Sequence, residues 1–160
     1  MKLIRQDYLK PNFEELDSMI KYVDELYDLS LKNQITYKEL NMLLAFQDND
    51  GSFKLINSYN IESDSRIYYC YYPTQIITAI IINEVLKNNL LISQDKLSLA
   101  LDRCVDKNLG GHGYDYYDYQ KKVYNKFIDA NVLDFIKKPI CTNKKFISVI
   151  NTLKGVYLYG

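Results

Sequence analysis

Histidine and cysteine are both scarce in this chain, which holds one histidine, His112, and three cysteines, Cys70, Cys104 and Cys141. No two cysteines form a Cys-x-x-Cys pair. A zinc site takes about four ligands, so a Cys/His site here would have to collect them from distant segments. We therefore expect no bound metal and no cofactor. We also expect reduced thiols, because an odd number of widely spaced cysteines is typical of a reducing compartment.

Long hydrophobic runs are also missing. The longest mainly apolar run, Ile76 to Ile82, is too short to span a bilayer. Residues 1–11 carry charges and lack the continuous apolar stretch of a secretion signal. The sequence predicts a cytoplasmic protein without a membrane span.

Neither sign of charge is in excess, because twenty basic residues balance twenty acidic ones. The basic residues occur singly or in pairs such as Lys121-Lys122 and Lys137-Lys138, so we expect no broad positive surface for phosphate backbones. Nucleic acid is not an expected partner.

The chain does contain enough apolar sequence for one core. Its 160 residues, with 48% hydrophobic and 25% charged side chains, have the size and composition of a single domain, residues 1–160. Tyrosine is abundant, with 16 residues. Three explanations stay open: an AT-rich coding sequence, a tyrosine-lined binding surface, and tyrosines at the edges of a helical core.

Apolar residues recur at helical spacing through most of the chain. Asn12 and Glu15 predict a capped start for a first helix, and Thr36 with Glu39 forms a capping box for a second. Pro73 suits the first turn of a third helix, which is apolar nearly all the way round and is therefore expected at the centre of the domain. The expected helices cover residues 13–31, 36–47, 73–88, 93–109, 116–128, 132–136 and 146–155.

The predicted fold class is all-α, with about six or seven helices in an array of antiparallel αα-hairpins. The helical period disappears between residues 53 and 72, where a long loop and a short β-hairpin both fit. Long connections of this kind are often functional, so this segment is a candidate surface.

The stretch 36–53 has the pattern of an apolar helix ended by a glutamine, a short acidic turn, a glycine and an aromatic residue. The residues that carry it are Met42, Leu43, Gln47, Gly51 and Phe53. The pattern resembles the QW-type repeat of squalene cyclases and protein prenyltransferase β subunits, whose αα-barrels are called terpenoid cyclase toroids. The likeness covers about one repeat, with phenylalanine in the place of the usual tryptophan.

This resemblance implies a partial, toroid-like architecture. In it, the Gln47 amide bonds backbone groups left free at a helix end, and the Phe53 ring covers the turn. The acidic cyclase motif and the zinc ligands of the prenyltransferases have no counterparts in this chain, so the resemblance concerns structure and not reaction.

Two polar segments form the candidate binding surface, one before Pro73 and one at the glycine-rich stretch 110–115 that holds the only histidine. The candidate ligand-binding residues are Asp64, Arg66, Tyr69, Tyr72, His112 and Tyr114. Ordinary explanations also stay open, namely solvated charges in the first segment and a helix end followed by a turn in the second. The predicted function is a binding or interaction module for a small polar ligand, a glycan, a peptide or a protein partner.

A catalytic alternative uses Cys70, His112 and Asp115. Cys70 lies just ahead of the helix begun at Pro73, where a helix dipole lowers the pKa of a thiol, with His112 as base and Asp115 orienting its ring. A buried, inert thiol fits Cys70 equally. A third alternative is an isoprenoid or lipid binder that uses an apolar interior.

Overall fold

The structure is a computed structural model that describes residues 13–55, 71–105 and 117–158. These residues form seven α-helices and no β-strand, which confirms the all-α fold class. The helices are α1 (Leu16–Leu31), α2 (Tyr37–Ala45), α4 (Tyr72–Asn88), α5 (Gln94–Val105), α6 (Tyr117–Asp129), α7 (Val132–Phe135) and α8 (Lys144–Leu158).

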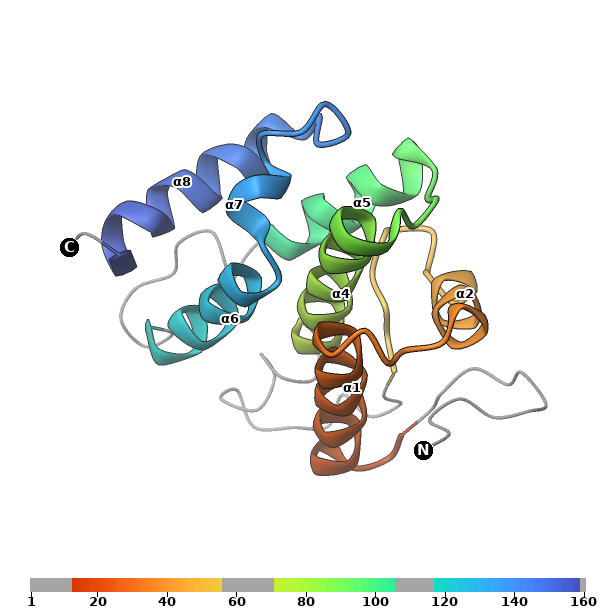
Figure 1. The fold of residues 1–160 in the computed structure, drawn as a ribbon. Coiled ribbons are helices and arrows are strands. Elements are labelled where there is room, and N and C mark those ends of the chain that lie inside the picture. The colour runs from red at the N-terminus through yellow and green to blue at the C-terminus, as the bar shows by residue number, and fades with distance from the viewer. Residues whose placement is uncertain (1–12, 56–70, 106–116, 159–160) are drawn as a thin grey trace.

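Helix α4 is the centre of the bundle, as its apolar pattern predicts. All of its residues from Tyr72 to Glu84 are buried. Helices α1, α5, α6 and α7 pack around it, and α8 packs on the outside of α5 (Figure 1). Each face of α4 therefore meets another helix, which is why hydrophobic residues are favourable around its whole circumference.

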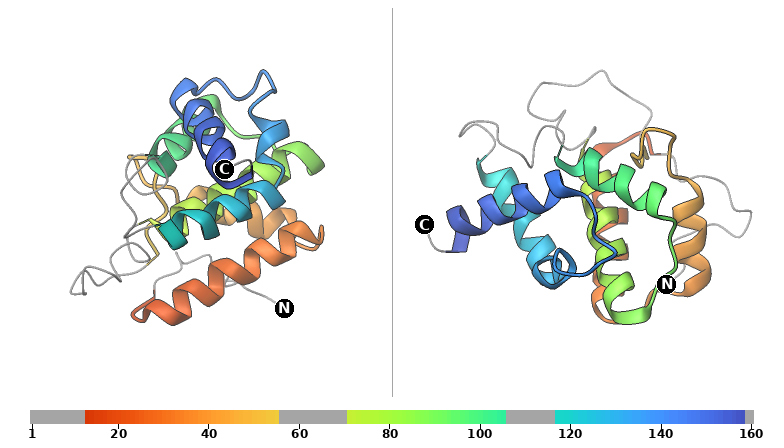
Figure 2. Two further views of the ribbon diagram at one scale, coloured as in Figure 1. Left: turned by 90° about the vertical axis from the view of Figure 1, so that its left-hand side faces the viewer. Right: turned by 90° about the horizontal axis from the view of Figure 1, so that it is seen from above.

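Helices α1, α4 and α6 run in the same direction. Asp24 and Ser30 of α1 contact Tyr72 and Asn83 of α4 in the same order along both helices. Tyr119, near the start of α6, contacts Gln75, near the start of α4. Figure 2 (left) shows the three helices running side by side from one end of the molecule to the other.

The antiparallel hairpin expected of neighbouring helices is present in α4 and α5, where Gln75 Nε2 donates to the Cys104 carbonyl oxygen over 3.0 Å. Helix α1, in contrast, packs mainly along α4 and parallel to it. The chain between them is long enough to return to the end at which α1 begins. Parallel packing then places the C-terminal ends of α1 and α4 next to each other.

Two helix starts differ in how well the sequence predicted them. Helix α2 follows the predicted cap, since the Thr36 hydroxyl accepts from the Glu39 N–H (3.1 Å) and donates to the Glu39 carboxylate (3.0 Å). Helix α1 begins later than predicted, with Glu15 as its N-cap. The reason is a tertiary contact: the Phe13 N–H donates to the Leu55 carbonyl oxygen over 2.8 Å, so this residue pairs with a distant segment and not with a helix.

Helix ends also differ from prediction. Helix α2 ends at Ala45, and α8 continues through Gly155 to Leu158. Residues 53–55 are extended without belonging to a strand, and residues 56–70 lie outside the described part of the chain. The choice between a loop and a hairpin therefore stays open.

Candidate functional site

Most of the predicted site residues lie outside the described residues. They are Asp64, Arg66, Tyr69, Cys70, His112, Tyr114 and Asp115. The polar rim and the thiol site both stay predictions. The described helices do meet one condition of the rim: the starts of α4 and α6 and the end of α5, which border the two segments, lie at the same end of the bundle.

Tyr72 is the one predicted ligand-binding residue that the structure describes, and its side chain is fully buried. Its hydroxyl donates to the Asp24 carboxylate over 2.6 Å, and the Lys122 ammonium lies 5.1 Å from the ring centroid. The Tyr119 ring packs against it edge-on. Tyr72 thus joins α1, α4 and α6 in the core and does not offer an open ring face.

A second buried contact joins three helices one turn further along α4. The Tyr119 hydroxyl donates to the Gln75 side-chain oxygen, and the Gln75 amide donates to the Cys104 carbonyl. Cys104 and Cys141 are both free and buried. Burial raises the pKa of the Cys104 thiol to about 12, which disfavours the nucleophilic thiolate form at neutral pH.

Gln47 connects the turn after α2 with the first turn of α5. Its amide nitrogen lies 3.0 Å from two acceptors, the carbonyl oxygens of Gly51 and Lys96. The Phe53 ring is fully buried, and the Phe53 N–H donates to the Thr74 hydroxyl of α4 over 2.9 Å. These residues link α2, α5 and α4.

The acidic turn itself is held by Asp50. Burial alone would raise the pKa of this carboxyl group, but hydrogen bonds from Ser52 and the neighbouring Lys54 ammonium lower it to about 2. Lys54 Nζ lies 3.2 Å from the carboxylate. Because the pair is well exposed to solvent, its contribution to stability is small.

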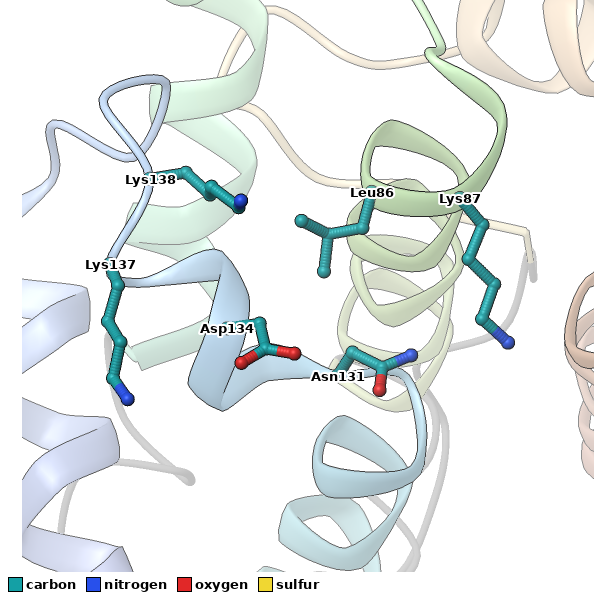
Figure 3. A pocket seen from close by; sticks show the side chains of 6 residues that line it. All are labelled: Leu86, Lys87, Asn131, Asp134, Lys137 and Lys138. Atoms are coloured by element: carbon teal, nitrogen blue, oxygen red, sulfur yellow. The ribbon is translucent and has the colours of Figure 1, made fainter.

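A ligand-sized pocket, which we call the lysine pocket, lies between the end of α4 and α7. Its volume is about 440 Å³. It is lined by Leu86, Lys87, Asn131, Asp134, Lys137 and Lys138. Figure 3 shows the Lys138 side chain extending toward Leu86 across the pocket and Asp134 on α7 near Asn131, while the Lys87 and Lys137 side chains at the two edges extend away from its centre.

The residues that line the lysine pocket carry a net positive charge, since they include three lysines and one aspartate. Within the described ranges, none of these four charged groups forms an ion pair. The sequence showed Lys137-Lys138 only as an isolated basic pair. The sequence did not indicate that Lys87 lies near this pair, because some fifty residues separate Lys87 from it. Only the packing of α7 on α4 brings the two segments together.

No set of three or more His, Cys, Asp or Glu side chains suited to a metal ion occurs among residues 13–55, 71–105 and 117–158. None of the helices in those same ranges is both long and apolar enough to cross a membrane.

Comparison of the chain with protein-family models, with curated proteins and with solved structures finds no match in any of the three.

Proposed function

We propose that this protein is a binding module for a small anionic ligand, such as a carboxylate or a phosphate ester, that occupies the lysine pocket. The observation that carries the proposal is the pocket itself, a volume of about 440 Å³ with three lysines and one aspartate among its lining residues. This volume lies in the range of about 300–1,000 Å³ usual for small-molecule sites.

The chemistry of the lining supports an anion. An ammonium group that has no internal ion pair is available to a ligand without breaking an existing contact, and a bond between charged groups is stronger than one between neutral groups. Leu86 supplies an apolar wall, while the Asn131 amide supplies a further donor. Asp134 repels an anion. Removing its charge should therefore strengthen anion binding, just as removing a lysine charge should weaken it.

The setting of the pocket supports a preformed site. Helix α4 is buried along most of its length, and α7 packs directly against it. Phe135 and Val132 of α7 are fully buried, so the backbone that carries the lysines is anchored in the core. A cytoplasmic location fits the free thiols of Cys104 and Cys141.

The test is a titration with succinate and with inorganic phosphate at low ionic strength, followed by NMR amide shifts near Asn131 and Leu86. Butane-1,4-diol serves as a neutral control. We expect Lys138→Gln to weaken anion binding by about threefold to tenfold and Asp134→Asn to strengthen it by about twofold to fivefold, as removing one charge contact predicts. Added salt should weaken binding.

Lys145→Gln is the matched control, since this exposed lysine of α8 does not line the pocket. Equal affinities for the diol and the dianion would reject the proposal. So would equal losses in the Lys138 and Lys145 variants, because these would indicate an effect of net charge alone.

For the α2 segment, we propose that Gln47, Gly51 and Phe53 act as a structural unit of the QW type. The support is that the Gln47 amide donates to the carbonyl oxygens of Gly51, in the turn after α2, and of Lys96, in the first turn of α5, and that Phe53 is fully buried. This proposal concerns architecture only.

A further inference from the structure

A second pocket lies beside the same C-terminal part of α4, where α1 ends and α2 begins. It encloses about 160 Å³. It is lined by Asn33, Ile35, Tyr37, Leu40, Glu84, Asn88 and Leu90. We call it the Glu84 pocket, because Glu84 is its one charged residue.

Glu84 is a buried carboxylate, 3% exposed. The Ser30 hydroxyl donates to one of its oxygens, and the Asn88 amide donates to the other over 3.0 Å. No lysine or arginine among the described residues forms an ion pair with it. A buried carboxylate is normally paired with a cation, because removing the charge from water is costly, and hydrogen bonds from neutral donors replace only part of the lost solvation.

The pocket lies between the C-terminal ends of two helices, and its surroundings carry both signs of charge, since Lys32 is the C-cap of α1 and Lys87 lies in the last turn of α4. Helices α1 and α4 are parallel, so both place their C-terminal ends beside this pocket. Each C-terminal end carries a partial negative charge, although the carbonyl oxygens of Asp28, Leu29, Ser30 and Glu84 already accept hydrogen bonds. Among the described residues that line the pocket itself, Glu84 alone carries a charge, and this charge is negative.

The carboxylate is also held in place before any ligand arrives. The Asn83 amide donates to both the hydroxyl (3.0 Å) and the carbonyl oxygen (3.1 Å) of Ser30. This double contact leaves the Ser30 hydroxyl proton directed at Glu84. A fixed carboxylate loses little entropy when a partner binds, which favours affinity.

The walls indicate which kind of cation fits. Ile35, Leu40 and Leu90 are apolar, and Tyr37, 65% exposed, brings an aromatic ring to the rim. Ca²⁺ takes about 6–8 oxygen ligands, which one carboxylate and three aliphatic walls do not supply. An alkylammonium ion, in contrast, fits this lining. Its ammonium group can lie beside the Glu84 carboxylate and near the Tyr37 ring, which attracts a cation, while its alkyl chain contacts the aliphatic side chains.

We propose that the Glu84 pocket binds a primary ammonium group carried on a short alkyl chain, with Glu84 as its ionic partner and the amide oxygens of Asn33 and Asn88 as further acceptors. This site is separate from the lysine pocket and selects the opposite charge. Either proposal therefore stands or fails without the other.

The test is an NMR titration of the full chain with n-butylammonium chloride, with n-butanol as the neutral compound of the same length. The amide signals of Asn33, Glu84 and Leu90 report on the pocket. We expect n-butylammonium to bind at least about tenfold more tightly than n-butanol, as a charge-assisted hydrogen bond predicts, and Glu84→Gln to abolish this preference. Asp17→Asn is the matched control, because it removes the same charge from the other end of α1.

Two rim variants keep the proposal falsifiable if Glu84→Gln does not fold. Tyr37→Ala and Asn33→Gly both alter exposed residues, and glycine accepts the left-handed backbone of Asn33, where φ is 57°. Each should weaken n-butylammonium binding by at least about twofold. Equal binding of n-butanol, a preference that survives Glu84→Gln, an equal loss in Asp17→Asn, or unchanged affinity in both rim variants would overturn the proposal.

Discussion

At the scale of single residues, the two described glycines have opposite roles. Gly51 has φ of +92°, and a Cβ atom there would lie 2.4 Å from the Leu99 carbonyl oxygen. The turn after α2 thus requires both the left-handed backbone and the close approach to α5. Gly155 lies within α8 with open space around it, so neither requirement applies.

The substitutions Gly51→Ala and Gly155→Ala should therefore change stability in opposite directions. We expect Gly51→Ala to lower the free energy of unfolding by about 2–4 kcal/mol, because the backbone and the Leu99 contact are both strained. Gly155→Ala should raise it by about 0.5–1 kcal/mol, the usual gain from alanine within a helix. Urea denaturation measures both. Equal effects of the two variants would show that the contact with Leu99 is unimportant.

At the scale of elements, hydrogen bonds at helix ends explain where the helices start and stop. Thr36 caps α2 through its hydroxyl, Asn143 accepts from the Phe146 N–H in the first turn of α8, and Ser93 accepts from the Lys96 N–H at the start of α5. Each of these bonds is local in sequence. The start of α1 is the exception, because Phe13 bonds to the distant Leu55.

Removal of the α2 cap should destabilise the protein modestly. We expect Thr36→Ala to cost about 1 kcal/mol, because the Glu39 N–H loses its partner. Thr36→Ser keeps the hydroxyl and should change stability by less than about 0.5 kcal/mol. Thermal unfolding followed by circular dichroism distinguishes the two. A loss in the serine variant as large as in the alanine variant would assign the effect to the lost methyl group and not to the cap.

At the scale of the whole molecule, the buried helix α4 joins the surrounding helices in one core. Helix α4 contacts helices that come before and after it in the chain. Elsewhere in the core, the ring of Phe127 in α6 packs edge-on against the ring of Phe146 in α8, with 5.9 Å between the ring centroids. Cys104 lies inside this core, fully buried, which makes its thiol a reporter of opening.

Alkylation of Cys104 should therefore require unfolding of the core. Burial holds the pKa of this thiol near 12, so labelling of the native state at neutral pH should be very slow. Phe127→Ala removes a fully buried ring at a cost of about 3–5 kcal/mol and should speed labelling by about a hundredfold or more. Mass spectrometry of labelled peptides measures the rate. Fast labelling in the wild-type protein would contradict the buried position.

The sequence by itself determined the helical class, the cap of α2 and the central place of α4, because periodicity and capping depend on residues within one or two turns. It also contained an unused signal: Asn83 and Glu84 are polar residues on a helix that is apolar all round, where burial requires partners. Only the tertiary structure decided that Ser30 is the partner of both Asn83 and Glu84, that Asp24 bonds to Tyr72, and that Lys87 lines the same pocket as Asp134 of α7. These contacts join residues about fifty positions apart in several cases, and their free energy arises from packing and desolvation between helices, which no local pattern encodes.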